Sequence, residues 1–380
     1  MNSVETKPAA RPQNGQTQAC WRLGSVLGVS ALSALTLPEF GPQTSDLVYA
    51  PAASLVLERD LREFTRWNMK SVKRLRGGID QGDPPVTMDG SNELRLRYHD
   101  RFVDIAPAVN GIARPLRIER GIDEIGGNFE LTASLAGQHE VQSFEWLSPY
   151  DDWDLELQWV PSDEYYRVHR SGEQIEQLEL SSRADLSVLL PQQAGNFGVG
   201  SQWTMSERGI FDLLRPLGEL IIEPKQLAPI PYRVIAPLNM GATSVLSLRE
   251  FARGLTGKAG VGWTETKETE SGDVATLILD FDLDVDSDST RAFGRLIAAT
   301  GVDPARDELT MRSTGKLRGK GKVYWDLARG HARSMSLRFD FDLNVNLSWY
   351  EETGAGQVDM RVEAAVDGQS ELRWTLTAKD

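Results

Sequence analysis

Apolar and polar residues alternate along much of the chain, which is the pattern of strands with one buried face. The two clearest stretches run from Leu277 to Asp286 and from Leu337 to Leu347. The first sets Leu277, Leu279, Phe281, Leu283 and Val285 against Asp280, Asp282, Asp284 and Asp286. Shorter stretches of the same kind begin at Leu94 and at Trp153. The pattern predicts long antiparallel strands with a hydrated outer side.

Helical periodicity is confined to two short segments. One joins Ile210, Leu213, Leu214 and Leu217, and the other joins Val245, Leu248, Phe251 and Leu255. The segment from Leu55 to Leu75 fits either a helix or a strand. Turns are predicted where glycine follows or precedes other small or polar residues. These sites are Gly126-Gly127, Ser271-Gly272-Asp273, Gly354-Ala355-Gly356 and Asp367-Gly368.

Together these elements predict an α+β fold that is mainly antiparallel β. We expect two strand-rich halves, built as curved sheets, a sandwich or a half-barrel, with a few short helices. The proline-rich stretch Glu223 to Pro237 is the best internal boundary, because proline can neither donate to a strand ladder nor continue a helix. The predicted division is therefore a leader with linker at 1–45, an N-terminal half at 46–225 and a C-terminal half at 226–380.

The N-terminus has the character of an export signal. Residues 1–22 are polar and carry Lys7, Arg11 and Arg22, and an uncharged apolar run follows from Leu23 to Leu37. That run is shorter than the ~20 residues of a membrane-spanning helix. We predict cleavage before Ala34, which leaves a soluble mature chain in the periplasm or outside the cell, without a membrane span. The alternative is a short buried helix or a disordered tail.

Charge and cysteine content exclude several classes of protein. The formal net charge of −14 opposes binding to nucleic acid. A local basic run from Arg312 to Lys322 is interpreted as a hydrated hairpin turn. Cys20 is the only cysteine, so the chain cannot form an internal disulfide or a cysteine-based zinc cluster. Cys20 also precedes the apolar run of the leader, whereas a lipidated cysteine would follow it.

A set of short segments, taken in order, resembles an uncharacterised family of secreted proteins from planctomycete-type bacteria. The segments are Arg114 to Arg117, Ile122 to Ile125, Leu147 to Pro149, Leu186 to Pro191, Val199 to Trp203, and Val323 to Leu327 with Gly330-His331. The resemblance covers most of the mature chain. It implies export, a β-rich fold and a strand rather than a helix at Leu55 to Leu75. This family has no assigned activity, so the resemblance implies no site residues.

No local motif for catalysis or metal binding is present in the sequence. The nucleophile elbow G-x-S-x-G is absent, and none of His99, His139, His169 and His331 lies in an H-E-x-x-H arrangement. The aspartates from Asp280 to Asp288 would be spread along ~13 Å of a strand rather than converging on a calcium ion. We interpret them as a hydrated strand face. Asp151, Asp152 and Asp154 are assigned to a turn, and the glycines from Gly254 to Gly262 to a helix end followed by turns.

The sequence thus favours a non-catalytic exported protein that binds an apolar or amphipathic ligand or an envelope partner. Ten tryptophans, several of them on alternating strands, motivate the apolar ligand, although they would also fill an ordinary core. We expect no catalytic residue, metal or cofactor. One alternative is a carbohydrate-active hydrolase that uses acidic residues such as Glu145 and Glu156. Another is a structural or interaction module of the cell envelope.

Overall fold

The computed structural model describes residues 47–82, 86–135, 138–162, 165–175, 185–191, 197–214, 223–224, 254–290, 308–354 and 356–379. The chain divides into two compact units, Met1–Gly41 and Pro42–Asp380. All the described residues belong to the second unit. The predicted leader lies outside them, so its cleavage and its export function stay predictions.

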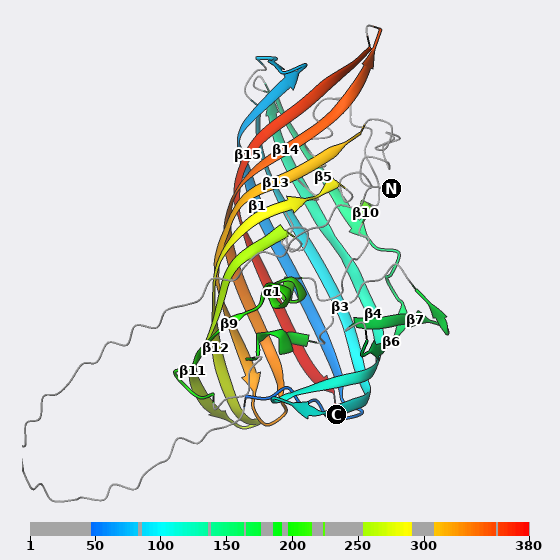
Figure 1. Ribbon diagram of the computed structural model, residues 1–380, viewed down its shortest axis with the longest axis vertical. Coiled ribbons are helices and arrows are strands. Elements are labelled where there is room, and N and C mark those ends of the chain that lie inside the picture. The colour runs from blue at the N-terminus through cyan, green and yellow to red at the C-terminus, as the bar shows by residue number, and fades with distance from the viewer. Residues whose placement is uncertain are drawn as a thin grey trace, which may run out of the picture. The chain divides into compact units, whose positions relative to one another are not determined.

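The second unit is built almost entirely from strands (Figure 1). The strands before the proline-rich stretch are β1 Val56–Arg76, β2 Ile79–Asp80, β3 Val86–Val109, β4 Ile112–Leu135, β5 Gln138–Leu147, β6 Asp154–Val160, β7 Tyr165–Arg170, β8 Glu173–Gln174 and β9 Gln202–Met205. The later strands are β10 Glu223–Pro224, β11 Leu255–Thr269, β12 Gly272–Asp288, β13 Thr310–Asp326, β14 His331–Thr353 and β15 Gly356–Lys379. The described helices are the 3₁₀ helix η1 Asp185–Leu189 and the α-helix α1 Glu207–Leu214.

All the described strands belong to one antiparallel sheet, which corrects the predicted α+β class. The main order is β8-β7-β6-β4-β3-β1-β15-β14-β13-β12-β11-β9, and β2, β5 and β10 pair beside this path. β1 pairs with β15 from Val56 opposite Lys379 to Arg76 opposite Met360. The two predicted strand-rich halves are thus neighbours in a continuous sheet, because the first and last long strands form hydrogen bonds to each other. The division into domains at the proline-rich stretch stays a prediction.

Of the two predicted helices, the first is confirmed over Glu207–Leu214 as α1, and its predicted last residue, Leu217, lies outside the described residues. Ser206 caps it, since its hydroxyl accepts a hydrogen bond from the Gly209 amide at 3.0 Å. Ile210, Leu213 and Leu214 are buried on one side of α1. The second predicted helix lies outside the described residues except at its end, where Gly254 and Leu255 are described and Leu255 is the first residue of β11. Gly254 has 3₁₀-helical conformation, as the predicted helix end requires, but the turns predicted to follow it are wrong, because Leu255 to Gly262 belong to β11.

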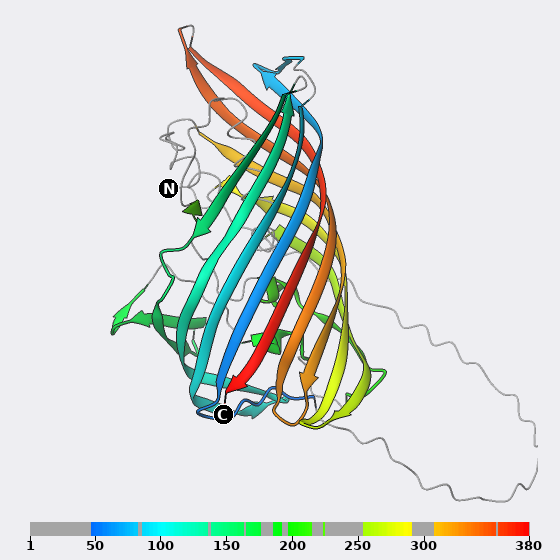
Figure 2. The ribbon, with the colours of Figure 1, turned by 180° about the vertical axis from the view of Figure 1, so that it is seen from behind.

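The alternation predicted for β12 and β14 is confirmed. The segment from Leu55 to Leu75, which fitted either a helix or a strand, forms the strand β1. The apolar side chains of these strands are buried on one side of the sheet, here called the inner face, and most of their charged side chains lie on the outer face. Arg59 and Glu63 of β1 are exceptions, because both are buried on the inner face. The sheet curls so that α1 lies on its inner side (Figures 1 and 2). α1 packs against β11 and η1, and η1 packs against β14. Trp67, Trp263, Trp325 and Trp374 are fully buried members of this core.

The basic run from Arg312 to Lys322 is not a hairpin turn but the middle of β13. Its basic side chains lie on the outer face beside the aspartates of β12. Arg312 bonds Asp286, Lys316 lies 3.0 Å from Asp284, and Arg318 lies 3.5 Å from Asp282. The aspartate array and the basic run, which are 30 or so residues apart in sequence, therefore form one ladder of opposite charges.

Two of the four predicted turns are confirmed and two are wrong. Ser271 lies between β11 and β12, with Gly272 and Asp273 as the first residues of β12, and Gly354 and Gly356 lie where β14 ends and β15 begins; Ala355 lies outside the described residues. Gly126-Gly127 and Asp367-Gly368 instead lie inside β4 and β15. A Cβ atom on Gly127 would lie 1.9 Å from the Glu93 carbonyl oxygen, and one on Gly368 would lie 2.4 Å from Cζ of Phe341. These glycines allow close packing and do not form turns.

No helix in the described part of the chain has both the length and the hydropathy that a bilayer-spanning helix needs.

Candidate functional site

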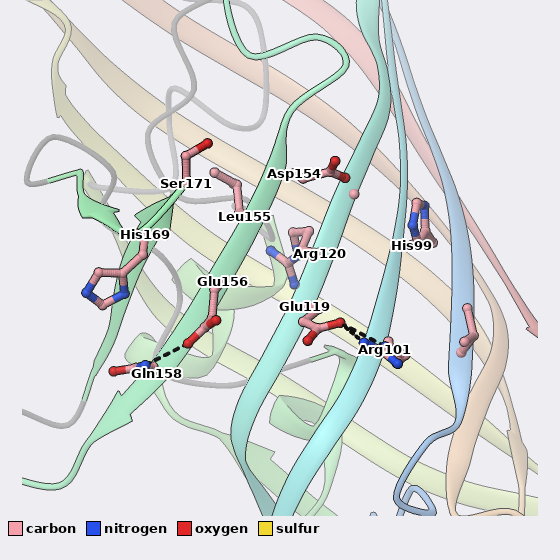
Figure 3. A pocket seen from close by; sticks show the side chains of 13 residues that line it. His99, Arg101, Glu119, Arg120, Asp154, Leu155, Glu156, Gln158, His169 and Ser171 are labelled. Atoms are coloured by element: carbon pink, nitrogen blue, oxygen red, sulfur yellow. Dashed lines mark hydrogen bonds and ion pairs between the residues drawn. The ribbon is translucent and has the colours of Figure 1, made fainter.

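A cleft of about 800 Å³ opens on the outer face, over β3, β4, β6 and β7 (Figure 3). Its size is typical of pockets that hold small molecules. Most of its lining is polar or charged. The lining residues are Val56, His99, Arg101, Glu119, Arg120, Gly121, Asp154, Leu155, Glu156, Gln158, His169, Ser171 and Gly172.

The register of four strands places the polar side chains of the cleft side by side. Arg101 of β3 lies opposite Glu119 of β4, Glu119 lies opposite Glu156 of β6, and Glu156 lies opposite His169 of β7. Because alternate residues of a strand point to the same face, these four positions form a row across the outer face. The strand framework thus fixes the positions of the backbone atoms that carry the cleft residues.

The end of the cleft at β7 is formed by a tight hairpin turn. Ser171 and Gly172 join β7 to β8, and both have positive φ angles, 52° and 85°. Two consecutive residues with positive φ are typical of the type I′ turn of two-residue hairpins. Glycine adopts this conformation without strain, so Gly172 helps to keep the turn tight and the lining of the cleft in place.

Each carboxylate in the row is held by a basic group. Arg101 donates from Nε to Glu119 at 2.8 Å. The Arg117 Nη2 atom lies 2.9 Å from a Glu156 oxygen and 3.8 Å from a Glu119 oxygen, so one guanidinium bridges two carboxylates that face each other across neighbouring strands. Gln158 donates a further hydrogen bond to Glu156 at 2.6 Å (Figure 3). Bridging removes the repulsion expected of two like charges in this position.

These contacts lower the pKa of Glu156. The hydrogen bond from Gln158 is the largest cause, and the hydrogen bond and charge of Arg117 add to it against a smaller opposing effect of desolvation. The carboxylate form is therefore favoured. A carboxyl group that acts as a general acid near neutral pH needs the opposite shift.

The imidazole ring of His99 covers β4 at Gly121, where the strand has no side chain. A Cβ atom on Gly121 would lie 2.2 Å from His99 Cε1, so the imidazole ring rests against the Gly121 backbone. The ring is oriented by Asp123, whose carboxylate lies 3.1 Å from His99 Nδ1. This contact occupies Nδ1, whereas Nε2 has no hydrogen-bond partner among the described residues. Glycine at 121 is required by this close contact.

Two other polar groups of the cleft have unused hydrogen-bonding capacity. His169 Nδ1 is shielded from solvent and has no hydrogen-bond partner in the described part of the chain. Asp154 is exposed, and the described residues supply no ion-pair partner for its carboxylate. Asp154 lies at the start of β6, opposite Gly121.

A buried cluster of charges lies on the inner side of the same strands. Asp100 accepts two hydrogen bonds from Arg120, at 2.6 and 2.8 Å, and lies 3.2 Å from Arg59 Nη1. The Tyr98 ring lies under both guanidinium groups, 4.7 Å from Arg120 and 5.3 Å from Arg59. Burial alone would raise the pKa of Asp100, but the two arginines outweigh it, so the pKa lies below its ordinary value. The cluster links β1, β3 and β4 directly beneath the cleft.

The structure separates the two glutamates that sequence analysis considered as a hydrolase pair. Glu145 of β5 lies opposite Asn128 of β4, whereas Glu156 lies opposite Glu119. These positions on β4 are nine residues apart, which is about 30 Å along a strand. The carboxyl groups of a glycosidase lie no more than about 9.5 Å apart. Glu145 and Glu156 therefore cannot act on one glycosidic bond.

The four histidines have different positions. His99 and His169 line the cleft, while His331 is buried and its Nδ1 lies 2.7 Å from the Ala332 carbonyl oxygen. His139 of β5 lies 2.5 Å from Ser134 Oγ. Asp151 and Asp152 lie in the turn before β6, as predicted, but Asp154, which was assigned to the same turn, is the first residue of β6.

Sequence reasoning missed Arg101, Glu119 and Asp154 as members of one site. The alternation that begins at Leu94 continues through His99 and Arg101, so the exposure of these two residues was accessible to pattern analysis. Their proximity to Glu119 and Glu156 was not, because it depends on which residues of β4 and β6 lie opposite each other.

Comparisons with known proteins give no family. No family model matches the chain, and no curated protein matches it. Among solved structures, the chain is similar to the outer membrane protein OprG from Pseudomonas aeruginosa, with 10% identity, a TM-score of 0.22, and coverage of 86% of this chain and 98% of that one. It is also similar to Pseudomonas aeruginosa OccK7 (OpdD), with 9% identity, a TM-score of 0.19, and coverage of 85% and 99%. We draw neither a fold nor a function from TM-scores this low.

Proposed function

We propose that this protein is a soluble, non-catalytic binding protein of the cell envelope, located outside the cytoplasm, and that the cleft over β3, β4, β6 and β7 holds its ligand. The observation that carries the proposal is the cleft itself. Its polar groups are fixed on strands, and a strand framework positions them with little loss of conformational freedom on binding.

The electrostatics of the cleft favour binding over acid catalysis. Glu119 and Glu156 are ion-paired, and the pKa of Glu156 is lowered. Ser171 lies in the turn after β7 and His99 lies on β3, and the two strands are separated by β6 and β4, which is about 14 Å at the usual strand spacing. A serine that far from a histidine gains no general base from it.

The chemistry of the lining favours a polar ligand. The sequence suggested an apolar or amphipathic ligand because of the tryptophans, but the four fully buried tryptophans pack in the core. Val56 and Leu155 are the aliphatic residues of the described cleft, and the rest of its lining is glycine or polar. An envelope protein as partner stays within the proposal, with the outer face as the surface available to it.

A blocking variant tests whether the cleft binds the ligand. Gln158→Trp would place an indole in the cleft, and Gln357→Trp places the same side chain on the exposed hairpin between β14 and β15. Thermal unfolding is followed in the presence of fractionated polar extracts. We expect one or more fractions to raise the Tm of the wild type and of Gln357→Trp but not of Gln158→Trp. Equal stabilisation of all three proteins, or of none, would contradict the proposal, as would a chemically altered ligand recovered from the protein.

Export is tested separately by cell fractionation. The full chain is produced in a bacterium, and the N-terminus of the product is sequenced. We expect an extracytoplasmic product that begins at Ala34. A full-length product in the cytoplasm would remove the envelope location without affecting the cleft.

A further inference from the structure

We infer that the cleft is a subsite for an uncharged, hydroxyl-rich ligand, such as a neutral oligosaccharide, and that Asp154 is a residue that determines this specificity. This inference rests on the proposed function, because it names the ligand class of the same cleft. The observation that carries it is a charge-balanced row of planar polar side chains beside the carboxylate of Asp154, which has no ion-pair partner in the part of the chain that the structure describes.

Charge balance is the first step. Each acidic group of the row has a basic neighbour: Glu119 is paired with Arg101, and Glu156 is paired with Arg117. Beneath them, Arg120 is paired with Asp100. A row whose charges are neutralised internally attracts neither phosphate nor a polyamine strongly, because opposite fields from neighbouring groups cancel. Ligands that carry a net charge therefore gain little from the row, and Asp154 is the charged group of the lining that no described residue pairs.

The available hydrogen-bonding groups are the second step. Asp154 offers two acceptor oxygens, His99 offers Nε2, and Ser171 offers a hydroxyl that both donates and accepts. Donors and acceptors lie at both ends of the cleft. A ring with several hydroxyl groups matches such a mixture, since each hydroxyl both donates and accepts.

The shape of the cleft is the third step. Gly172 leaves the backbone open to the ligand, since nothing lies within 4 Å of a Cβ atom at that position, and Val56 adds an apolar contact for C–H groups. The volume of about 800 Å³ accommodates more than one ring. The ion-paired carboxylates of the row are held by their arginines, so they serve as fixed acceptors whose orientation is set before the ligand binds.

Calorimetric titration of the purified protein tests the inference with three kinds of probe. The first is a set of neutral trisaccharides based on glucose, galactose and N-acetylglucosamine, the second is spermidine, and the third is inorganic phosphate. We expect one or more neutral trisaccharides to bind. Loss of the Asp154 charge in Asp154→Asn should weaken that binding roughly tenfold or more, because hydrogen bonds to a charged group are the stronger ones. Asp282→Asn removes an exposed carboxylate of β12 on the same face and should leave binding unchanged.

The outcomes separate the inference from the proposed function. Preferential binding of spermidine or phosphate that Gln158→Trp abolishes would overturn the neutral ligand but retain a ligand-binding cleft. Trisaccharide binding that Asp154→Asn leaves unchanged would overturn the role of Asp154 in specificity. If no probe binds while a polar extract still stabilises the wild type and not Gln158→Trp, the saccharide class is wrong and the cleft still binds a ligand. If neither probes nor extracts act, both the inference and the proposed function fail.

Discussion

At the scale of single residues, the buried carboxylate of Asp100 is the group whose removal would disturb its neighbouring side chains most. It is the shared acceptor of Arg59 and Arg120, and all three side chains are nearly or fully shielded from solvent. Removing one partner from a buried ion pair leaves charge uncompensated in a medium of low polarity. The cluster also lies directly under the cleft, so its loss would affect the strands that position the ligand groups.

Asp100→Asn is therefore expected to lower the free energy of unfolding by about 3–5 kcal/mol. Urea denaturation followed by tryptophan fluorescence measures the effect. The exposed variant Asp282→Asn is the control, with a change within about 0.5 kcal/mol. A loss for Asp100→Asn no larger than that of the control would show that the buried cluster does not stabilise the fold.

The same group predicts a pH dependence. Because the pKa of Asp100 is lowered in the folded protein, its contribution is complete above the unfolded value of about 3.9 and is lost as the pH falls through the lower folded value. The difference in unfolding free energy between the wild type and Asp100→Asn should thus narrow below about pH 4 and stay constant from pH 5 to 8. A difference that instead grows on acidification would contradict the assigned sign.

Gly368 tests the role of glycine inside the strands. A Cβ atom there would lie 2.2 Å from the Arg66 carbonyl oxygen and 2.4 Å from the Phe341 ring. Gly368→Ala should destabilise the fold by about 1–3 kcal/mol through overpacking. Gly354→Ala is the matched control, because nothing lies within 4 Å of a Cβ atom at that position. Chemical denaturation of both variants gives the comparison, and equal stability would show that the sheet adjusts freely at Gly368.

At the scale of elements, β12, β13 and β14 form a striped outer face. Lys316 of β13 lies opposite Asp284 of β12 and Asp342 of β14. The inner faces of the same strands are apolar. The charges on the outer face therefore influence strand pairing only where opposite charges lie side by side. The stripe therefore favours the observed register over a two-residue slip less strongly than the packing of the inner face does.

Reversing one charge of the stripe tests this contribution. Lys316→Asp places three like charges in a row and should lower the Tm by about 1–3 °C at low ionic strength. The effect should shrink in high salt, because exposed charges are screened. Adding Asp284→Lys to the first change restores an opposite pair and should recover most of the loss. A Tm shift that is independent of salt would show that the effect is not electrostatic.

The pattern of apolar and polar residues predicted well where the strands lie and which face of each is buried. It predicted poorly which strands lie next to each other. Alternation gave β12 and β14 directly, and the tryptophan strand at β6 followed from the same rule. The basic run was misread because lysine and glycine together are typical of turns, whereas in β13 the glycines make room for Phe339 and Leu337 of the next strand. That information belongs to the partner strand and is not present in the run itself.

The candidate site shows the same limit. Each of its side chains lies on a segment whose local structure the sequence indicates, but the site exists only because β6 pairs with a short part of β4 near Glu119. Asn110-Gly111 is a local signal that was available, since asparagine followed by glycine is typical of a two-residue hairpin and here joins β3 to β4. No comparable signal fixes the register of β6 on β4.

At the scale of the whole molecule, β1 and β15 hold the two halves of the sheet together. Their ladder extends over nearly all of β1, and Thr65 and Ser370 lie 2.8 Å apart on it through their hydroxyl groups. Each strand would have an unpaired edge and an uncovered inner face without the other. Two halves that share so long a ladder are not expected to fold independently.

Fragments of the chain test this expectation. Residues 47–224 and 254–379, produced separately, should lack cooperative thermal unfolding and should aggregate through the exposed edges of β1 and β15. Co-expression should give a stable complex that elutes as one species on size-exclusion chromatography. Cooperative unfolding of either fragment alone would show that the halves are independent domains, as the sequence-based division at 225 and 226 suggests.

The ladder between the first and last long strands also affects how the protein reaches its native state. Thr65 and Ser370 are 305 residues apart in sequence, so the contact between them has a high contact order. Chains dominated by such non-local contacts fold slowly, because a long loop must close before the contact stabilises it. β1 has no partner on one side until synthesis of the C-terminus is complete. A chain that remains incompletely folded during synthesis needs protection of the exposed β1 edge until β15 pairs with it.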